Sequence, residues 1–220
     1  MKKSFLIIGL GRFGINVART LTRAGHSVLG VDSDGDIIQK FSFEIDNVMK
    51  LDATDSDVLD TLGISEFEAV IISIGEKYIQ NSILATLLVK EKGAKHIIAK
   101  AGTKVQGKVL EKVGADTIVF PEKDMGQRIG KTLSSDTLID YIELSPEVSI
   151  IELKVPLFMH GKNLIELNLR KKYSVTIISI KDKDGNVKTP PDVNYKFTEF
   201  DVLTLIGENE QFKKLHFIDF

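Results

Sequence analysis

The chain has 220 residues, 43% of them hydrophobic, with 29 Lys and Arg against 31 Asp and Glu and no cysteine. This length suits one large domain or two small ones. The net charge of −2 gives no signal for nucleic acid or an anionic membrane, and the lack of cysteine excludes disulfides and thiolate chemistry. No apolar run approaches the roughly 20 residues that span a bilayer, and residues 1–4 resemble no signal-peptide cleavage site. A cytoplasmic location is expected.

Apolar runs alternate with helical patterns through the first part of the chain. The expected strands are residues 5–8, 28–32, 47–50, 69–74, 96–99 and 117–120, and the expected helices are residues 15–24, 35–43, 56–62, 78–92 and 105–113. The strands are almost continuously apolar, as in a parallel sheet that helices cover on both faces. This order predicts a six-stranded, Rossmann-like, doubly wound α/β fold.

The pattern changes after a further helix at 123–133 and a polar break at 134–137. The expected elements are then strands at 138–144, 150–155, 175–180 and 202–206, helices at 164–173 and 209–215, and a hairpin turn at 182–185. We predict a small α+β domain here. The predicted boundaries are 1–134 for a nucleotide-binding domain with its crossover helix, and 135–220 for the second domain.

A glycine-rich loop follows the first predicted strand. Gly9 permits the tight exit from the strand, Gly11 allows a phosphate to approach the backbone, and Gly14 allows close packing of the helix that follows. The free N–H groups at the start of that helix face the phosphates. Asp32 lies about 20 residues further on, at the distance from which an acid reaches ribose hydroxyls. This arrangement predicts an adenine nucleotide site and disfavours NADP, because a carboxylate repels its 2′-phosphate.

The chemistry of a dehydrogenase is not evident. Hydride transfer needs a proton donor or acceptor beside the nicotinamide, and the sequence has neither a Tyr-x-x-x-Lys pair nor a Gly-x-Ser-x-Gly elbow. The histidines are widely separated: His26, His96, His160 and His216. No spacing of His, Cys and Asp indicates a structural zinc site. A nucleotide site without catalytic groups indicates a sensor rather than an enzyme.

Several motifs resemble the RCK (regulator of K⁺ conductance) family. Residues 9–14, 51–54, 72–75, 109–116 and 121–126 resemble its N-terminal (TrkA-N) domain, and residues 161–173 and 175–180 resemble its C-terminal (TrkA-C) domain. The length is similar to that of the Ktr type, a cytoplasmic regulatory subunit of bacterial potassium uptake systems. The resemblance implies a non-enzymatic subunit that gates a membrane potassium translocator from the inner face of the membrane, with no nucleic acid partner.

The resemblance also implies ligands and assembly. Such proteins form homodimers that assemble into rings, often octamers. ATP and ADP, or NAD and NADH in some members, compete for the N-terminal site and switch the ring. Some members hold a divalent cation such as Mg²⁺ between paired ATP sites, and some bind cyclic di-AMP at the C-terminal domain.

By resemblance, the phosphates are surrounded by Gly9, Gly11, Arg12, Phe13 and Gly14, the ribose by Asp32 and Ser33, the adenine by Asp52, Ala53 and Thr54, and the phosphate side of the pocket by Ile74 and Gly75. Arg12 is expected to reach the γ-phosphate in the neighbouring subunit. Lys100 ends the fifth strand and either meets a phosphate or is a surface lysine. Glu122 either helps to hold the cation or complements a helix N-terminus.

The second effector site is assigned, also by resemblance, to Ile165, Arg170, Ile177 and Pro190. The alternative is a core helix with an exposed arginine and an apolar dimer face. A second proline at position 191 departs from the family pattern and places the rim of this pocket in question. Two other functions remain open for the whole chain: an NAD-dependent oxidoreductase, and a stand-alone nucleotide or redox sensor without a channel.

Overall fold

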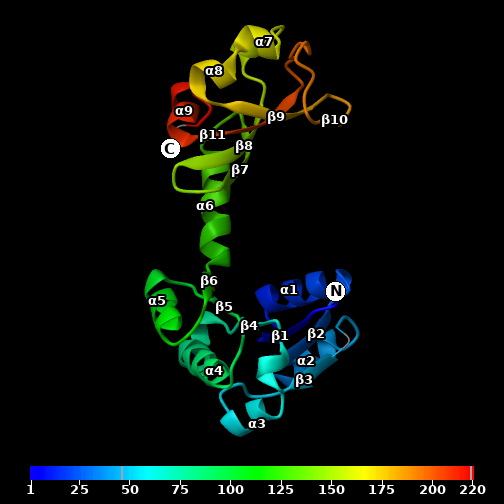
Figure 1. Ribbon diagram of the computed structural model, residues 1–220, viewed down its shortest axis with the longest axis vertical. Helices are drawn as coiled ribbons and strands as arrows, with labels where there is room; N and C mark the ends of the chain where they lie inside the picture. The colour runs from blue at the N-terminus through cyan, green and yellow to red at the C-terminus, as the bar shows by residue number, and fades with distance from the viewer. Residues whose placement is uncertain (46, 219) are drawn as a thin grey trace. The chain divides into compact units, whose positions relative to one another are not determined.

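Six parallel strands form the sheet of the N-terminal part of the chain (Figure 1). They are β1 (Ser4–Ile8), β2 (Ser27–Asp32), β3 (Asn47–Lys50), β4 (Ala69–Ile72), β5 (Ile97–Lys100) and β6 (Thr117–Val119), in the order β3-β2-β1-β4-β5-β6. The computed structural model therefore confirms the predicted doubly wound fold. The strand order reverses between β1 and β4, and ligands of such sheets bind at the carboxyl ends of the strands beside this reversal.

Helices cover both faces of this sheet. They are α1 (Arg12–Arg23), α2 (Gly35–Phe41), α3 (Ser56–Asp60), α4 (Ile79–Glu91) and α5 (Lys104–Lys112), with 3₁₀ turns η1 (Ile64–Glu66) and η2 (Glu76–Tyr78). Successive side chains of a strand point to opposite faces. Accordingly, Leu6 and Ile8 of β1 belong to the apolar cluster that contains Ala85 of α4, whereas Ile7 belongs to the cluster that contains Ile15 of α1.

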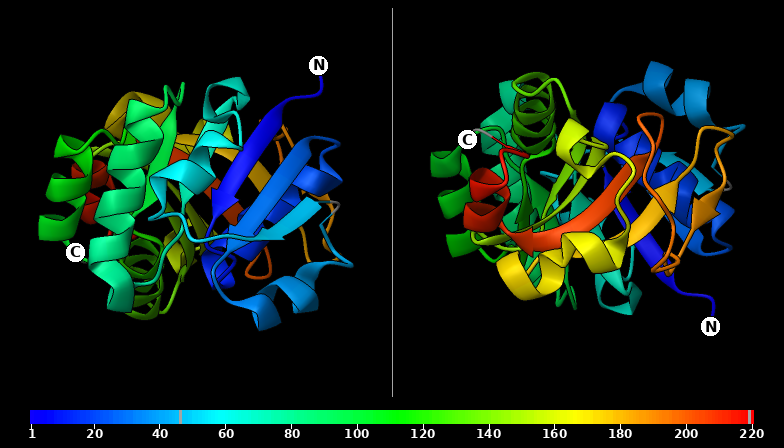
Figure 2. Two further views of the ribbon diagram at one scale, coloured as in Figure 1. Left: turned by 90° about the horizontal axis from the view of Figure 1, so that it is seen from below. Right: turned by 90° about the horizontal axis from the view of Figure 1, so that it is seen from above.

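The second sheet is antiparallel. Its strands are β7 (Leu138–Glu143), β8 (Val148–Lys154), β9 (Thr176–Lys181), β10 (Val187–Lys188) and β11 (Val202–Glu208), in the order β10-β9-β11-β8-β7. Figure 2 shows the long strand β11 running beside β9. The helices are η3 (Leu157–Met159), α7 (Leu164–Leu167), α8 (Leu169–Tyr173) and α9 (Asn209–Lys214). The predicted α+β domain is confirmed, and the two-residue strand β10, which the predicted strands did not include, pairs with β9 across the predicted hairpin turn.

The helix predicted over residues 164–173 is two short helices. A capping box between Asn163 and Glu166 begins α7, because each side chain accepts a hydrogen bond from the other residue's backbone N–H. Asn168 then adopts a left-handed conformation with φ of 47° and ends that helix before α8 begins. The sequence-based prediction of one continuous helix was wrong because asparagine tolerates this conformation better than most residues.

The structure describes residues 1–45, 47–218 and 220. By their internal contacts these residues divide into two units, Met1–Lys123 and Asp124–Phe220. The division falls within α6 (Pro121–Leu133), so most of this crossover helix makes its contacts with the second unit, whereas the predicted boundary at 134 and 135 assigns it to the first. None of the described helices combines the length and the apolar character needed to cross a membrane.

Candidate nucleotide-binding site

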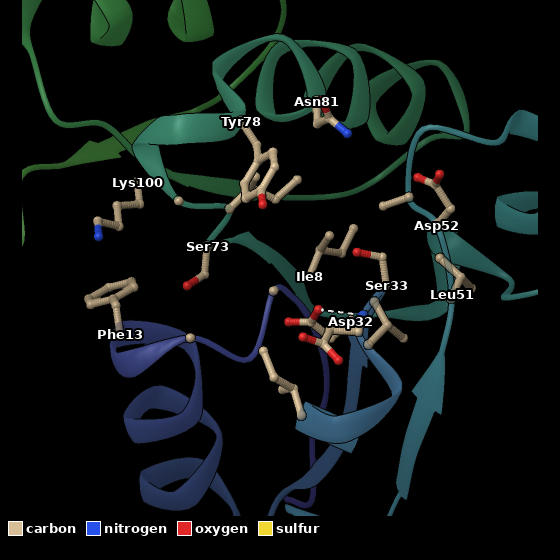
Figure 3. Close-up of a pocket in the computed structure, with 18 of the residues that line it drawn as sticks. Ile8, Phe13, Asp32, Ser33, Leu51, Asp52, Ser73, Tyr78, Asn81 and Lys100 are labelled. Atoms are coloured by element: carbon tan, nitrogen blue, oxygen red, sulfur yellow. Dashed lines mark hydrogen bonds between the residues drawn. The ribbon is translucent and has the colours of Figure 1, made fainter. Parts of the chain in front are cut away.

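A cavity of about 510 Å³ opens at the carboxyl end of the parallel sheet (Figure 3). The structure brings twelve of the thirteen residues predicted for the nucleotide to its wall, and Glu122 with them. The twelve are Gly9, Gly11, Arg12, Phe13, Asp32, Ser33, Asp52, Ala53, Thr54, Ile74, Gly75 and Lys100. The thirteenth, Gly14, lies behind the loop. Residues far apart in the sequence thus meet at one edge of the sheet, as the order of its strands requires.

The three glycines of the loop meet different surroundings. A Cβ on Gly9, whose φ is +94°, would lie 2.9 Å from the carbonyl oxygen of Ser73, and one on Gly14 would lie 2.0 Å from the carbonyl oxygen of Gly9. Both positions therefore admit only glycine. A Cβ on Gly11 would meet no atom within 4 Å. Gly11 faces the open cavity. The packing of the protein therefore does not require glycine here, and the missing side chain leaves space for a ligand.

The N-terminus of α1 faces the same cavity. Gly11 is the N-cap residue, and no side chain caps the helix. The first intrahelical bond of the backbone is donated by Ile15 N–H to Gly11 C=O at 2.9 Å, so the N–H groups before it lack intrahelical acceptors. Free N–H groups and the positive end of the helix dipole favour an anion, which suits the phosphates of a nucleotide.

Asp32, at the end of β2, holds the glycine loop in place. Its Oδ2 accepts a hydrogen bond from Leu10 N–H at 2.8 Å, and its Oδ1 accepts one from Asp34 N–H at 3.0 Å. A carboxylate has about four lone-pair sites, so these two bonds leave capacity for ribose hydroxyls. The residue predicted only as a ribose ligand is therefore also a structural support of the loop.

The loop after β3 forms the opposite wall. Asp52 accepts hydrogen bonds from both the backbone N–H (2.9 Å) and the hydroxyl (2.7 Å) of Thr54, and these bonds hold the pKa of the Asp52 carboxyl below its usual value. Between them, Ala53 is buried and packs into the apolar core. The carboxylate thus fixes a tight turn, and the turn positions Thr54 at the cavity wall.

Cationic side chains gather at the other side of the cavity, where Figure 3 shows Lys100 and Phe13 away from Asp32 and Asp52. Lys100 Nζ donates to Glu122 Oε1 at 2.7 Å. This bond is the main reason why the pKa of Glu122 is lowered, and the positive charge of Arg12 lowers it further. Arg12 itself is exposed.

Several residues that line the cavity belong to no recognisable sequence motif. Ser73 follows β4 and is only 5% exposed, and its hydroxyl has no hydrogen-bond partner within the described part of the chain. Tyr78 and Asn81, at the start of α4, close the cavity from above in Figure 3. Their position follows only from knowing that β4 lies next to β1, the strand that carries the glycine loop.

Two domain models match this chain: the TrkA-N domain over residues 5–121 and the TrkA-C domain over residues 149–216. The chain is 41% identical over 212 residues to the Ktr system potassium uptake protein A of Bacillus subtilis, covering 96% of this chain and 95% of that protein. It is 40% identical over 207 residues to the Ktr system potassium uptake protein C of the same organism, covering 94% and 93%. The chain belongs to the RCK family of potassium-uptake regulators.

Solved structures show the same fold. The GsuK channel covers 99% of this chain with a TM-score of 0.73 and 23% identity, and this chain spans 39% of that longer protein. The GsuK channel has also been solved bound to NAD, with a TM-score of 0.70, and bound to ADP, with a TM-score of 0.52 over 62% of this chain. At this identity the likeness establishes an RCK fold in both proteins.

The residues assigned to the second effector lie on three elements of the RCK C-terminal domain and on the loop after β10. Ile165 of α7 and Arg170 of α8 are exposed, and so is Pro190 beside β10. Ile177 of β9 is only 7% exposed and packs in the core of this unit. Three of the four side chains are thus exposed, whereas the fourth belongs to the apolar core.

Metal ligands are sparse. Among residues 1–45, 47–218 and 220, no group of three or more His, Cys, Asp or Glu side chains is placed to hold a metal ion. Glu122 is the carboxylate at the cationic side of the cavity, and Lys100 already neutralises it. Mg²⁺ is commonly held by one or two carboxylates with phosphate oxygens and water. Glu122 alone therefore fits a cation only where phosphates supply the remaining ligands.

Proposed function

We propose that this RCK subunit binds an adenine nucleotide in the cavity and thereby gates a membrane potassium-translocating subunit. ATP and ADP compete for the site and favour different conformations of a ring of homodimers, with NAD and NADH as the other candidate pair. The protein acts in the cytoplasm, at the inner face of the membrane, through its partner. The observation that carries this proposal is the polarity of the cavity, with Asp32 on one side, the α1 N-terminus in the middle, and Arg12 and Lys100 on the other.

This polarity matches the chemistry of a nucleotide. Ribose hydroxyls donate hydrogen bonds to a carboxylate, and phosphates accept them from backbone N–H groups and cations. The GsuK channel, which shares this fold, binds NAD and ADP. Both ligands combine an adenosine with a phosphate chain, and both suit a cavity with these two sides.

A ligand shifts a conformational equilibrium only if it binds the two states differently. Two features of Arg12 support a role in this difference. It is exposed at the start of α1, and its guanidinium has no hydrogen-bond or ion-pair partner in the part of the chain that the structure describes. We propose that it binds the γ-phosphate of ATP held by the neighbouring subunit. Mg²⁺ near Glu122 would reduce the repulsion between two facing triphosphates.

The cavity suits a regulatory subunit better than an oxidoreductase. An acid or base catalyst works best with a pKa near the working pH. The pKa of Asp52 is lowered by its bonds to Thr54, and that of Glu122 by Lys100. Both shifts move the pKa of the carboxyl group further below neutral pH. Purified protein is expected to transfer no hydride to or from NAD with small hydroxy acids or aldehydes.

Calorimetric titration tests nucleotide binding directly. The purified full chain is titrated with ATP, ADP, NAD and NADH, and ATP and ADP are expected to bind with micromolar or weaker affinity and without hydrolysis. Binding of neither would overturn the proposal. Arg12→Ala is expected to lower the preference for ATP over ADP, whereas Arg23→Ala, at the far end of the same helix, leaves it unchanged.

Gating requires a separate measurement. Potassium flux is followed in vesicles that contain the membrane partner, with this subunit added together with ATP or ADP. ATP is expected to increase the flux over ADP, and light scattering is expected to show a dimer or larger ring. A monomer at every concentration, or flux that responds to neither nucleotide, contradicts the gating mechanism and leaves a stand-alone sensor.

We propose a second effector for the C-terminal domain, cyclic di-AMP, from the resemblance carried by Ile165, Arg170, Ile177 and Pro190. Arg170 is exposed and supplies a guanidinium for a phosphate. Arg170→Ala is expected to weaken cyclic di-AMP binding, and Lys172→Ala, on the same short helix, serves as the charge-matched control. Equal binding by wild type and Arg170→Ala would remove Arg170 from the site.

A further inference from the structure

The ion pair between Lys100 and Glu122 lies in the wall of the nucleotide cavity. Lys100 is the last residue of β5, and Glu122 belongs to the first turn of α6. The ammonium and carboxylate are 2.7 Å apart. The two side chains differ in exposure, because that of Lys100 is 13% exposed and that of Glu122 is 57% exposed. The Lys100 side chain is therefore held in place by the residues around it, whereas the Glu122 carboxylate lies at the surface and can move away from Lys100.

A phosphate and a carboxylate compete for the same donor. Both are anions that accept short, charge-assisted hydrogen bonds from an ammonium. Lys100 and Phe13 lie on the side of the cavity opposite Asp32 and Asp52 (Figure 3). Arg12 also lines the cavity, close enough to Glu122 for its charge to lower the pKa of that carboxyl. A phosphate chain that runs from the α1 N-terminus toward this side approaches Lys100 and meets the negative charge of Glu122 there. The charge of Glu122 thus opposes the phosphate that comes nearest to it.

We propose that Glu122 is an internal counter-ion of Lys100 that the outermost phosphate of the nucleotide displaces. The inference rests on the proposed nucleotide site and adds a determinant of its selectivity. A short phosphate chain leaves the Lys100–Glu122 pair intact, and a longer chain replaces the carboxylate on Lys100. The pair therefore sets how strongly the site prefers a triphosphate over a diphosphate, because only the longer ligand must break it.

The test removes the charge of Glu122 and keeps its shape. Glu122→Gln and wild type are titrated calorimetrically with ATP and ADP in EDTA, which excludes bridging cations. Glu122→Gln is expected to bind ATP more tightly by up to about fivefold, the upper end of the range for one partly exposed ion pair, with a smaller change for ADP. The matched control is Glu68→Gln, which breaks the pair with Lys3 (2.9 Å) outside the cavity and removes the same charge. It is expected to change neither affinity.

Lys100 supplies the second part of the test. Lys100→Gln is expected to weaken ATP binding, and the double variant Lys100→Gln with Glu122→Gln is expected to lose the gain that Glu122→Gln shows alone. The apo-state melting temperature of each variant shows whether it folds. If Glu122→Gln fails to fold, Glu122→Asp replaces it, because the shorter side chain holds Lys100 less well and is expected to give a smaller gain in the same direction.

The outcomes separate the two proposals. If wild type binds neither ATP nor ADP, the proposed function fails, and this inference fails with it. If both nucleotides bind and folded Glu122→Gln keeps the wild-type ratio of ATP to ADP affinity, the pair is a fixed structural contact and the inference alone is overturned. Weaker ATP binding by Glu122→Gln would also overturn it, because the carboxylate would then assist the ligand rather than compete with it.

Discussion

Replacing each of two loop glycines by alanine tests whether one supports the fold and the other the ligand. The comparison is between Gly14→Ala and Gly11→Ala. A Cβ at position 14 would lie 2.0 Å from the Gly9 carbonyl oxygen and 2.8 Å from Ser73 Oγ. The first of these is a backbone atom, so relief requires movement of the loop or of α1. Overpacking of this kind costs about 3 kcal/mol or more, and Gly14→Ala is expected to lose that much stability in the N-terminal unit.

Gly11→Ala is expected to weaken ATP binding while changing the stability of the protein little. Its Cβ would meet no protein atom within 4 Å, and its φ of −68° suits any residue. Alanine is a poorer N-cap than glycine, but it also restricts the unfolded chain, and the two effects leave a net change within about 1 kcal/mol. The added methyl group projects into the cavity beside the helix N-terminus. ATP affinity is therefore expected to fall about tenfold or more.

The assay combines scanning calorimetry of the nucleotide-free protein with titration of ATP. Calorimetry is chosen because the two units can unfold in separate transitions, and a single midpoint would mix them. Only the transition of the N-terminal unit is expected to shift in Gly14→Ala. The division between a structural Gly14 and a ligand-facing Gly11 is contradicted if Gly11→Ala destabilises that unit as much as Gly14→Ala does, or if Gly11→Ala binds ATP like the wild type.

Two further predictions concern hydrogen bonds made by side chains. Asp32→Ala removes the acceptor of Leu10 N–H and Asp34 N–H and is expected to lower the free energy of unfolding by about 2 kcal/mol; urea unfolding without nucleotide checks this, and unchanged stability would contradict the structural role of Asp32. Burial and the hydrogen bond to Asp201 (3.0 Å) raise the pKa of Tyr195 to about 12. Because the folded-state pKa exceeds the unfolded value of 10.0, the folded state keeps a proton that the unfolded state loses, so stability is expected to fall as pH rises from about 10 to about 12. Ultraviolet titration should show one late tyrosine that Tyr195→Phe removes, and four tyrosines ionising together would contradict the assignment.

Part of the cavity lining could be predicted from the glycine motif, which indicated Gly9, Gly11 and Asp32, whereas the loops after β3 and β4 were assigned only by the resemblance to the RCK family. Once Gly9 and Asp32 are placed at the carboxyl ends of adjacent strands, the topology of a doubly wound sheet brings the loops after β3 and β4 to the same edge. The motif identified Gly14 as a packing position, and the structure identifies its neighbours as Gly9 and Ser73.

Other contacts depend on side-chain geometry that no local pattern encodes. Ser73 follows an isoleucine-rich strand and looks like any serine at a strand end, yet it is buried beneath the glycine loop. The pair of Lys100 and Glu122 joins residues 22 positions apart on different elements. Periodicity places each of the two at the sheet edge, but only their three-dimensional arrangement brings Lys100 within 2.7 Å of Glu122.

The charge distribution of the cavity also fixes the direction in which a nucleotide can bind. Its acidic side carries Asp32, Asp34 and Asp52, and its cationic side carries Arg12 and Lys100. In the reversed orientation a phosphate would face the carboxylates, and two like charges 4 Å apart repel by about 4 kcal/mol near a protein surface. The same repulsion disfavours the 2′-phosphate of NADP. In the proposed nucleotide complex the phosphate chain is therefore expected to end at the cationic side, so discrimination by phosphate number is expected there and not at the ribose.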